Sequence, residues 1–97
     1  MNRTRTKRAD VYAALDGERK YQDEKWNTTN VFKPTESYLV YMKAYLDEAI
    51  HCISHDNGDF TALDKLRKVV ALGVACFEDN GVPTRYIPDS KTVLNGN

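Results

Sequence analysis

Hydrophobic positions recur at helical spacing in two segments of the chain, on either side of the polar dipeptide Asn57-Gly58. The members of this repeat are Leu39, Met42, Leu46, Ala49, Ile50 and Ile53, and then Leu63, Leu66, Val70, Gly73, Val74 and Phe77. The spacing i, i+3, i+7 and its continuation place each set along one face of an α-helix. We call these two sets the predicted core stripes. Matched stripes on helices of about 20 residues, joined by a short turn, predict an antiparallel two-helix hairpin.

Turn-forming residues mark the ends of these helices. Pro34-Thr35 is expected to open the second helix, and Asn57-Gly58 to end it with a left-handed glycine cap. Asn80-Gly81, followed by Val82-Pro83, is expected to stop the third.

A first helix is predicted from composition over residues 10–26. This segment lacks proline and is rich in Ala, Glu, Lys, Arg and Gln, with Asp16-Gly17 as a weak point. Residues 27–30 are Asn-Thr-Thr-Asn, whose side chains compete for backbone hydrogen bonds and favour a loop. The predicted fold class is therefore all-α, with a short N-terminal helix preceding the hairpin.

Each hairpin helix carries a second apolar face that one hairpin does not use. These faces consist of Tyr38, Tyr41 and Tyr45 on the second helix and of Val69, Leu72 and Cys76 on the third. Small chains that cannot complete a core commonly assemble, so we expect a homo-oligomer with the tyrosines packed at its interface. Ala49 and Gly73 are expected to permit close approach of the helix backbones.

Length and charge then limit the classes of protein. A chain of 97 residues makes one small domain, and its 14 basic and 14 acidic residues cancel, which argues against binding to long nucleic acid. We divide it into a basic arm (residues 1–8), a single helical domain (9–83) and a loose polar tail (84–97). The longest uncharged apolar run, residues 69–77, is too short to span a bilayer, and no secretory signal precedes it, so we expect a cytoplasmic protein without a membrane partner.

Few residues have the pattern of a metal site. His51, Cys52 and His55 form an H-C-x-x-H, but zinc needs three or four ligands and this sequence holds only two histidines and two cysteines. We interpret this group as an ordinary helix end, with Cys52 and Cys76 as reduced core thiols.

The acids do not indicate an enzyme either. Glu18, Asp23, Glu24 and Asp47-Glu48 lack the E-x-x-E and E-x-x-D spacings of helical nucleotide pyrophosphatases, so we interpret them as solvated charge. No nucleophile, phosphate-loop or metalloprotease motif is present, and none that calls for a cofactor.

Another group of residues suits the binding of a nucleotide. Tyr12, Tyr21 and Trp26 can stack on bases, and Asn27, Thr28 and Thr29 supply donors beside Lys25. Lys65, Arg67 and Lys68 form a basic cluster on the third helix, and ammonium and guanidinium groups suit phosphodiesters. A solvated basic face is the alternative interpretation.

Two blocks of sequence resemble a known family. Residues 18–26 (ERKYQDEKW), a tyrosine-rich helix and residues 66–78 (LRKVVALGVACFE) before Asn80-Gly81-Val82-Pro83 are similar to the phage anti-CBASS protein 2 family, over about residues 9–85. The resemblance implies a three-helix protomer assembled as a hexamer. It also implies a phage protein in the infected bacterial host that sequesters cyclic di- and trinucleotide messengers without cleaving them.

The resemblance also implies site residues. Tyr12, Lys25 and Thr28 are expected to bind a cyclic dinucleotide, with Asn27 and Thr29 in those places if the loop register differs. Arg67, beside Lys68 and one turn before Ala71, is expected to bind a cyclic trinucleotide. The alternatives are a divergent all-helical nucleotide pyrophosphohydrolase and a structural or DNA-associated phage protein.

Overall fold

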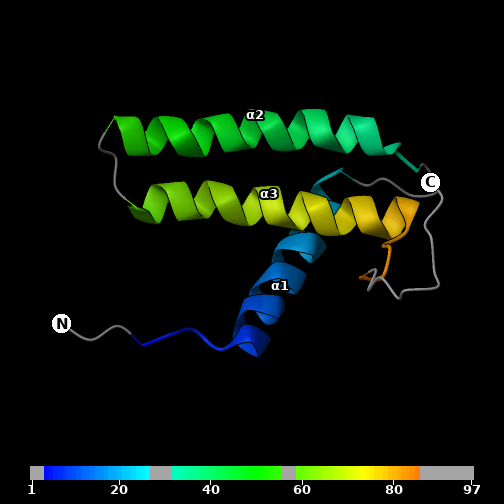
Figure 1. Ribbon diagram of the computed structural model, residues 1–97, viewed down its shortest axis with the longest axis horizontal. Coiled ribbons are helices and arrows are strands. Elements are labelled where there is room, and N and C mark those ends of the chain that lie inside the picture. The colour runs from blue at the N-terminus through cyan, green and yellow to red at the C-terminus, as the bar shows by residue number, and fades with distance from the viewer. Residues whose placement is uncertain (1–3, 27–31, 56–58, 86–97) are drawn as a thin grey trace, which may run out of the picture.

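The computed structural model describes residues 4–26, 32–55 and 59–85. Within these residues the chain forms three α-helices and no strand: α1 (Arg8–Trp26), α2 (Thr35–Ser54) and α3 (Asp59–Asn80). This confirms the all-helical class. In Figure 1, α3 runs back alongside α2, and α1 crosses at a steep angle beneath α3. The arrangement leaves α3 with a neighbouring helix on two sides.

The helix ends follow the turn residues of the sequence. Pro34 is in extended conformation directly before α2, and α3 ends at Asn80, with Gly81 in the left-handed region at a φ of 94°. The dipeptide Asp16-Gly17 does not interrupt α1, which is continuous through it. The predicted cap Asn57-Gly58 and loop 27–30 lie outside the described residues.

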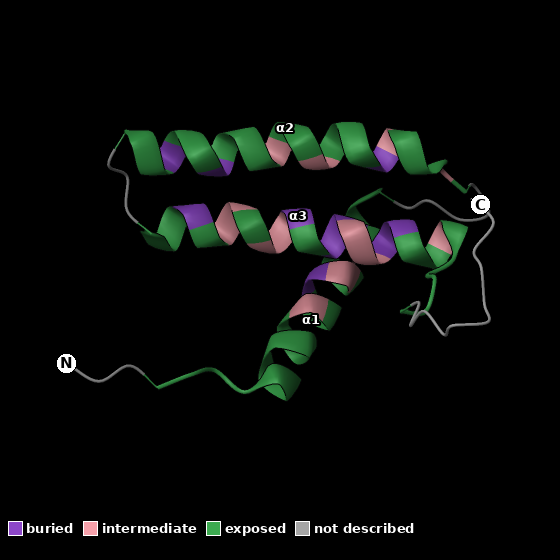
Figure 2. Cartoon of the chain, viewed as in Figure 1, coloured by how far each residue is buried: buried purple, intermediate pink, exposed green. Residues whose placement is uncertain are grey.

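Most members of the predicted core stripes are wrong in the direction that each helix faces, whereas Ala49 is buried as predicted. The buried apolar side chains are Tyr38, Ala49 and Cys52 on α2 and Ala62, Val69, Ala71, Leu72, Ala75 and Cys76 on α3. Most of this set lies one residue earlier than the predicted stripes, and one residue turns a helix by about 100°. Large aliphatic side chains that were expected inside, such as Ile50 (57% exposed) and Leu63 (59% exposed), therefore lie at the surface. Figure 2 shows buried residues between α2 and α3 and exposed residues on their outer sides.

The tyrosine face of α2 was expected to pack against a second protomer, but part of it packs in the core of the protomer itself. Tyr38 packs in one buried cluster with Leu72, Ala75 and Cys76, and Tyr45 packs against that cluster. The expectation that Tyr38, Tyr45, Val69 and Leu72 lack a partner within the protomer is therefore wrong. The physical reason is that the Tyr38 hydroxyl donates a hydrogen bond to Asp79, so that burial of the ring leaves no polar group unpaired.

Close helix approach does not require Gly73. A Cβ added there would lie 3.4 Å from Cε of Met42, which is ordinary van der Waals contact with a flexible side chain. Both cysteines are buried free thiols, as predicted.

Polar contacts attach α1 to α3. Glu18 and Gln22 are the buried residues of α1, and Glu18 Oε1 accepts a hydrogen bond from Arg67 Nε at 2.8 Å. On the same pair of helices, Arg19 Nη2 lies 2.6 Å from Glu78 Oε1. The prediction that Glu18 is solvated charge is therefore wrong, since a basic residue of α3 neutralises it. No helix in the described part of the chain has the length and apolar character needed to cross a membrane.

Candidate functional site

The residues expected at a cyclic-dinucleotide site do not meet within one protomer. Tyr12 lies near the start of α1, where its side chain is 63% exposed, and Lys25 lies at the other end. Thirteen residues of α-helix separate them by about 20 Å. Asn27, Thr28 and Thr29 lie outside the described residues.

Lys25 instead lies near Lys68, which was assigned to the cyclic-trinucleotide site. It lines a small cleft of about 40 Å³ together with Glu18, Tyr21, Gln22, Trp26, Tyr45 and Lys68, and its Nζ lies 5.9 Å from the centre of the Tyr21 ring. The acid of this cleft, Glu18, is paired with Arg67. Neither lysine forms an ion pair with a carboxylate among the described residues. Their positive charge is therefore available to an anion.

The basic cluster of α3 is partly neutralised by its neighbours. Arg67 Nε lies 2.8 Å from Glu18 Oε1 and Nη2 lies 2.7 Å from Asp64 Oδ1, while Lys65 pairs with Glu48 at 2.9 Å. The hydrogen bond to Glu18 raises the pKa of Arg67 above its ordinary value. The guanidinium of Arg67 thus remains partly exposed, but it is held by two acids.

Ala71 has no exposed surface. Its methyl group is therefore out of reach of a ligand in this conformation. The role that the resemblance implies for Ala71 is that of a small residue beside Arg67.

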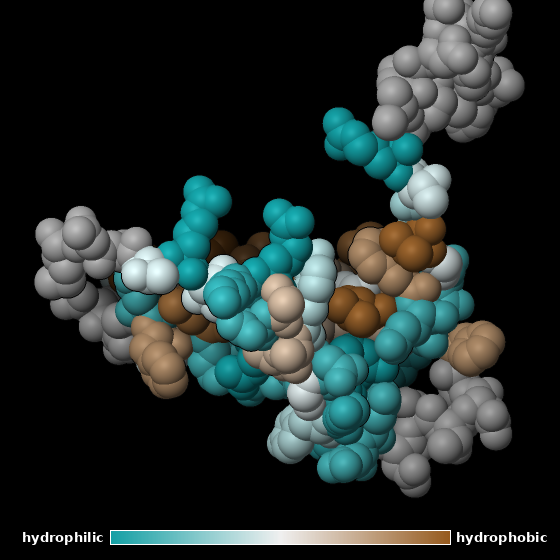
Figure 3. All heavy atoms as spheres, turned by 90° about the horizontal axis from the view of Figure 1, so that it is seen from below, coloured by the Kyte–Doolittle hydropathy of each residue, from teal (hydrophilic) through white to brown (hydrophobic). Residues whose placement is uncertain are grey.

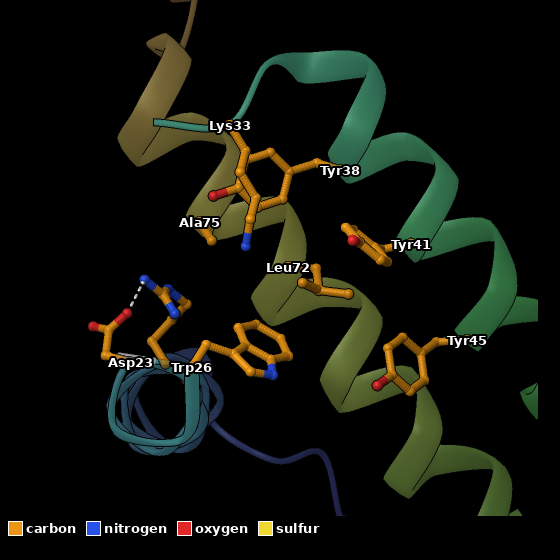
Figure 4. Close-up of a pocket in the computed structure, with 9 residues that line it drawn as sticks. Asp23, Trp26, Lys33, Tyr38, Tyr41, Tyr45, Leu72 and Ala75 are labelled. Carbon is orange, nitrogen blue, oxygen red and sulfur yellow. Dashed lines mark hydrogen bonds and ion pairs between the residues drawn. The ribbon is translucent and has the colours of Figure 1, made fainter. Parts of the chain in front are cut away.

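A larger pocket, which the sequence analysis did not anticipate, lies where the end of α1 meets α2 and α3 (Figure 4). It encloses about 340 Å³ and is lined by Arg19, Asp23, Trp26, Lys33, Tyr38, Tyr41, Tyr45, Leu72 and Ala75. Two signals of this pocket were present in the sequence: the tyrosine stripe, which was interpreted as an oligomer interface, and Trp26, which was named as a base-stacking residue. That Trp26 lies beside the tyrosines of α2 was not visible, because it depends on the angle at which α1 crosses α3.

Two cations border this pocket in different ways. Arg19 donates to Glu78 at 2.6 Å, to Asp23 at 2.8 Å and to Gln22 at 3.2 Å. Burial alone would lower the pKa of Arg19, but the hydrogen bonds to Glu78 and Asp23 raise it above the ordinary value. The guanidinium is therefore a fixed part of the pocket wall.

The ammonium group of Lys33 makes no such close contact with an acid among the described residues, although its charge helps to lower the pKa of Asp79. Its Nζ lies 5.5 Å from the centre of the Trp26 ring, a cation–π distance. Figure 4 shows this side chain extending toward the pocket.

The backbone of Lys33 is anchored to the end of α3. Its N–H donates to Asp79 Oδ2 at 3.1 Å, and its carbonyl accepts from Asn80 Nδ2 at 3.0 Å. The same Asp79 oxygen accepts from the Tyr38 hydroxyl, and this hydrogen bond lowers the pKa of Asp79. Burial raises the pKa of Tyr38, and Asp79 raises it further. This network fixes Lys33 at the edge of the pocket.

The histidines pack on one another at the end of α2. The rings of His51 and His55 stack with centroids 3.8 Å apart. Among the described residues, no three His, Cys, Asp or Glu side chains gather closely enough to hold a metal ion.

Comparison of the chain with protein-family models, with curated proteins and with solved structures found no match. The likeness of residues 18–26 and 66–78 to the anti-CBASS family therefore stays a prediction. What the described residues offer chemically is aromatic surface beside lysines.

Proposed function

We propose that this protein binds cyclic di- and trinucleotides and retains them uncleaved, as an anti-defence protein of a phage. In this proposal it acts in the cytoplasm of the infected bacterial host. It lowers the concentration of the messenger that would activate the CBASS effector.

One observation carries the proposal: α1 presents aromatic rings to solvent, and beside one of them lies a lysine that forms no ion pair among the described residues. Tyr12 and Tyr21 are 63% and 54% exposed, and Lys25 lies over the Tyr21 ring. Rings exposed in this way offer nucleobases a surface on which they can stack, whatever their sequence. A lysine beside the stacked base then attracts the phosphate.

The proposed dinucleotide site requires more than one protomer. Because about 20 Å separates Tyr12 from Lys25 along α1, one small ligand reaches both only if they come from different protomers. Tyr12 of one protomer would stack on the bases, while Lys25 and Thr28 of another hold the phosphates. If the loop register differs, Asn27 and Thr29 take these places.

The proposed trinucleotide site uses a symmetric arrangement of Arg67. Three copies of one guanidinium around a three-fold axis match the three phosphates of a cyclic trinucleotide. Lys68 adds charge beside each Arg67, and the small Ala71 leaves room one turn further along α3. In the free protein, each Arg67 guanidinium is paired with Glu18 and Asp64.

Assembly is part of the proposal, and the exposed aliphatic face supports it. A largely apolar groove of about 340 Å³ is lined by Leu46, Ala49, Ile50 and Ile53 of α2 and by Ala62, Leu63 and Leu66 of α3, with Asp59 as its one charged residue. Figure 3 shows hydrophobic side chains reaching the surface among hydrophilic ones. Antiparallel pairs of α2 and α3 that cover one another along this groove would build a homo-oligomer, for which the resemblance implies six copies.

Calorimetric titration with a panel of cyclic di- and trinucleotides tests the proposal. Tyr12→Ala is expected to weaken dinucleotide binding by about 1–3 kcal/mol with the assembly intact. Arg67→Ala is expected to abolish trinucleotide binding and to leave dinucleotide binding within a few-fold. Val40→Ala and Lys43→Ala, at exposed positions on α2, are the matched controls and are expected to bind both ligands as the wild type does.

The variants also separate the proposal from its alternatives. If Tyr12→Ala dissolves the assembly and leaves the affinity per folded chain unchanged, Tyr12 is a packing residue. If Arg67→Ala loses both ligands while it stays assembled, there is one site. A wild-type protein that binds none of the panel would favour a structural or DNA-associated role, and one that returns linear products would be a hydrolase.

A further inference from the structure

We infer that the pocket between the end of α1, Lys33, α2 and α3 is a separate binding site for a single nucleoside monophosphate. The base would stack between Trp26 and the tyrosines of α2, and the phosphate would bind Lys33. This site uses neither Tyr12 nor Arg67 and needs no second protomer. The inference can therefore be tested separately from the function proposed above.

The walls of the pocket fit a planar aromatic ring. Trp26 comes from α1 and Tyr41 and Tyr45 come from α2, and Figure 4 shows their rings around one space. The buried side chains of Leu72 and Ala75 close it from α3. An apolar floor between aromatic walls favours the faces of a heterocycle, because stacking buries the ring on both sides.

The incomplete burial of these walls indicates that the space is open to a ligand. Tyr41 is 51% exposed and Trp26 is 37% exposed, although each ring borders the enclosed volume. Rings that only filled the core would be covered, as Tyr38 is in the same pocket. The exposed area of Tyr41 and Trp26 is therefore the area that a bound base would cover.

The charge at the edge of the pocket favours an anionic ligand. The ammonium of Lys33 extends over Trp26 and makes no close ion pair among the described residues, although its charge also acts on the nearby Asp79 carboxylate and lowers the pKa of that group. Lys25 and Lys68, in the adjoining cleft that shares Trp26 and Tyr45, add two further positive charges, and Glu18, which also lines that cleft, is paired with Arg67. Among the described residues that line the pocket, the one carboxylate is that of Asp23, which lies 2.8 Å from Arg19 Nη2, and this guanidinium offsets its charge.

The volume decides between a single nucleotide and a cyclic oligonucleotide. Sites for small molecules usually enclose roughly 300–1,000 Å³, and this pocket of about 340 Å³ lies at the lower end of that range. It accommodates one base with its sugar and leaves the phosphate at the mouth. A cyclic di- or trinucleotide, with two or three bases on one rigid ring, does not fit inside.

Trp26 provides a direct measurement, because it is the only tryptophan of the chain. Its fluorescence, excited at the red edge of the indole absorption, is recorded while adenosine 5′-monophosphate, adenosine or inorganic phosphate is added to the full-length protein. We expect saturable quenching by adenosine monophosphate, saturation by adenosine at about tenfold higher concentration, and no change with phosphate.

Substitutions assign the parts of the site. Lys33→Gln is expected to weaken adenosine monophosphate about tenfold, to the affinity of adenosine, and to leave adenosine itself unchanged. Tyr41→Ala is expected to weaken both ligands about tenfold. Lys43→Gln, an exposed lysine of α2 away from the pocket that pairs with Asp47, is the control and is expected to bind like the wild type.

Three results would overturn the inference. One is the absence of saturable quenching by adenosine monophosphate at millimolar concentration. The second is an equal effect of Lys33→Gln and Lys43→Gln, which would indicate general attraction of anions. The third is a Trp26 emission that changes with protein concentration but not with ligand concentration. This result would place a second copy of the chain in the pocket.

Discussion

At the scale of single residues, the carboxylate of Glu18 depends on one partner. Its side chain is nearly buried where α1 meets α3, and Arg67 Nε lies 2.8 Å from it. A buried carboxylate that loses its cation keeps its desolvation cost without compensation. Arg67 therefore has a structural part in the protomer, whatever ligand it binds.

Arg67→Ala is expected to lower the free energy of unfolding by about 1–3 kcal/mol, because it leaves Glu18 charged and unpaired. The second substitution Glu18→Gln, made in the Arg67→Ala background, removes that charge and is expected to recover part of the loss. Urea denaturation of both variants measures the difference. An Arg67→Ala protein as stable as the wild type would contradict this assignment.

The hydrogen bond between Tyr38 and Asp79 makes stability depend on pH at both extremes. Burial and Asp79 raise the pKa of Tyr38 above its ordinary 10.0, so its contribution is complete below pH 10.0 and is lost as the pH rises through the raised value. The pKa of Asp79 is lowered from its ordinary 3.8, so its contribution is complete above pH 3.8 and is lost as the pH falls through the lowered value.

Tyr38→Phe is expected to cost about 1–2 kcal/mol at pH 7, because it removes a hydrogen bond to a carboxylate and keeps the ring. The difference from the wild type is expected to shrink in acid, where Asp79 is protonated, and in alkali, where Tyr38 ionises. Denaturant titrations from acid to alkaline pH check both limits. A difference that stays constant over the whole range would show that the pair does not titrate as described.

At the scale of the helices, the sequence predicted where they end better than which way they face. Pro34 and Gly81 act locally, through restricted or permissive backbone angles, so the start of α2 and the end of α3 were visible in the sequence. Which side of a helix is buried depends on which row of its side chains packs against another helix. A count of large aliphatic residues favoured Leu39 over Tyr38, whereas Asp79, distant in the sequence, allows Tyr38 to be buried.

The candidate site was predictable only in part for the same reason. Tyr12, Lys25 and Arg67 are candidates that residue type and the resemblance suggest, and they stay predictions. The pocket is not, because it forms only when α1 crosses α3 and brings Trp26 toward Tyr45. The spacing of residues within one helix does not predict the angle at which two helices cross.

Glycine substitutions test the helix assignments. Gly17→Ala is expected to stabilise the protein by about 0.5–1 kcal/mol, because it lies inside α1 and an added Cβ would meet nothing within 4 Å. Gly81→Ala is expected to destabilise by about 1–2 kcal/mol, because its φ of 94° is strained for an L side chain. Thermal unfolding followed by circular dichroism measures both. Effects of the same sign would contradict the continuity of α1 through Gly17 or the end of α3 at Asn80.

At the scale of the whole molecule, the proposed assembly rests on the aliphatic residues that the protomer leaves exposed. Ile50→Asp places a charge in the apolar groove and is expected to reduce the assembly to smaller species with the helices retained, because a desolvated carboxylate disfavours burial. Val40→Asp, at a more exposed position outside the groove, is the matched control. Sedimentation velocity distinguishes them, and a wild-type protein that sediments as a monomer at micromolar concentration would contradict the proposed assembly.

The fate of a bound cyclic nucleotide tests the central proposal most directly. The protein is mixed with a substoichiometric cyclic di- or trinucleotide and passed over a membrane that retains protein, and the retained fraction is then heated and analysed by chromatography. We expect the ligand to be retained before heating and to be recovered afterwards as the intact cyclic molecule. Free passage of every cyclic nucleotide through the membrane, or recovery of linear products, would contradict the proposal.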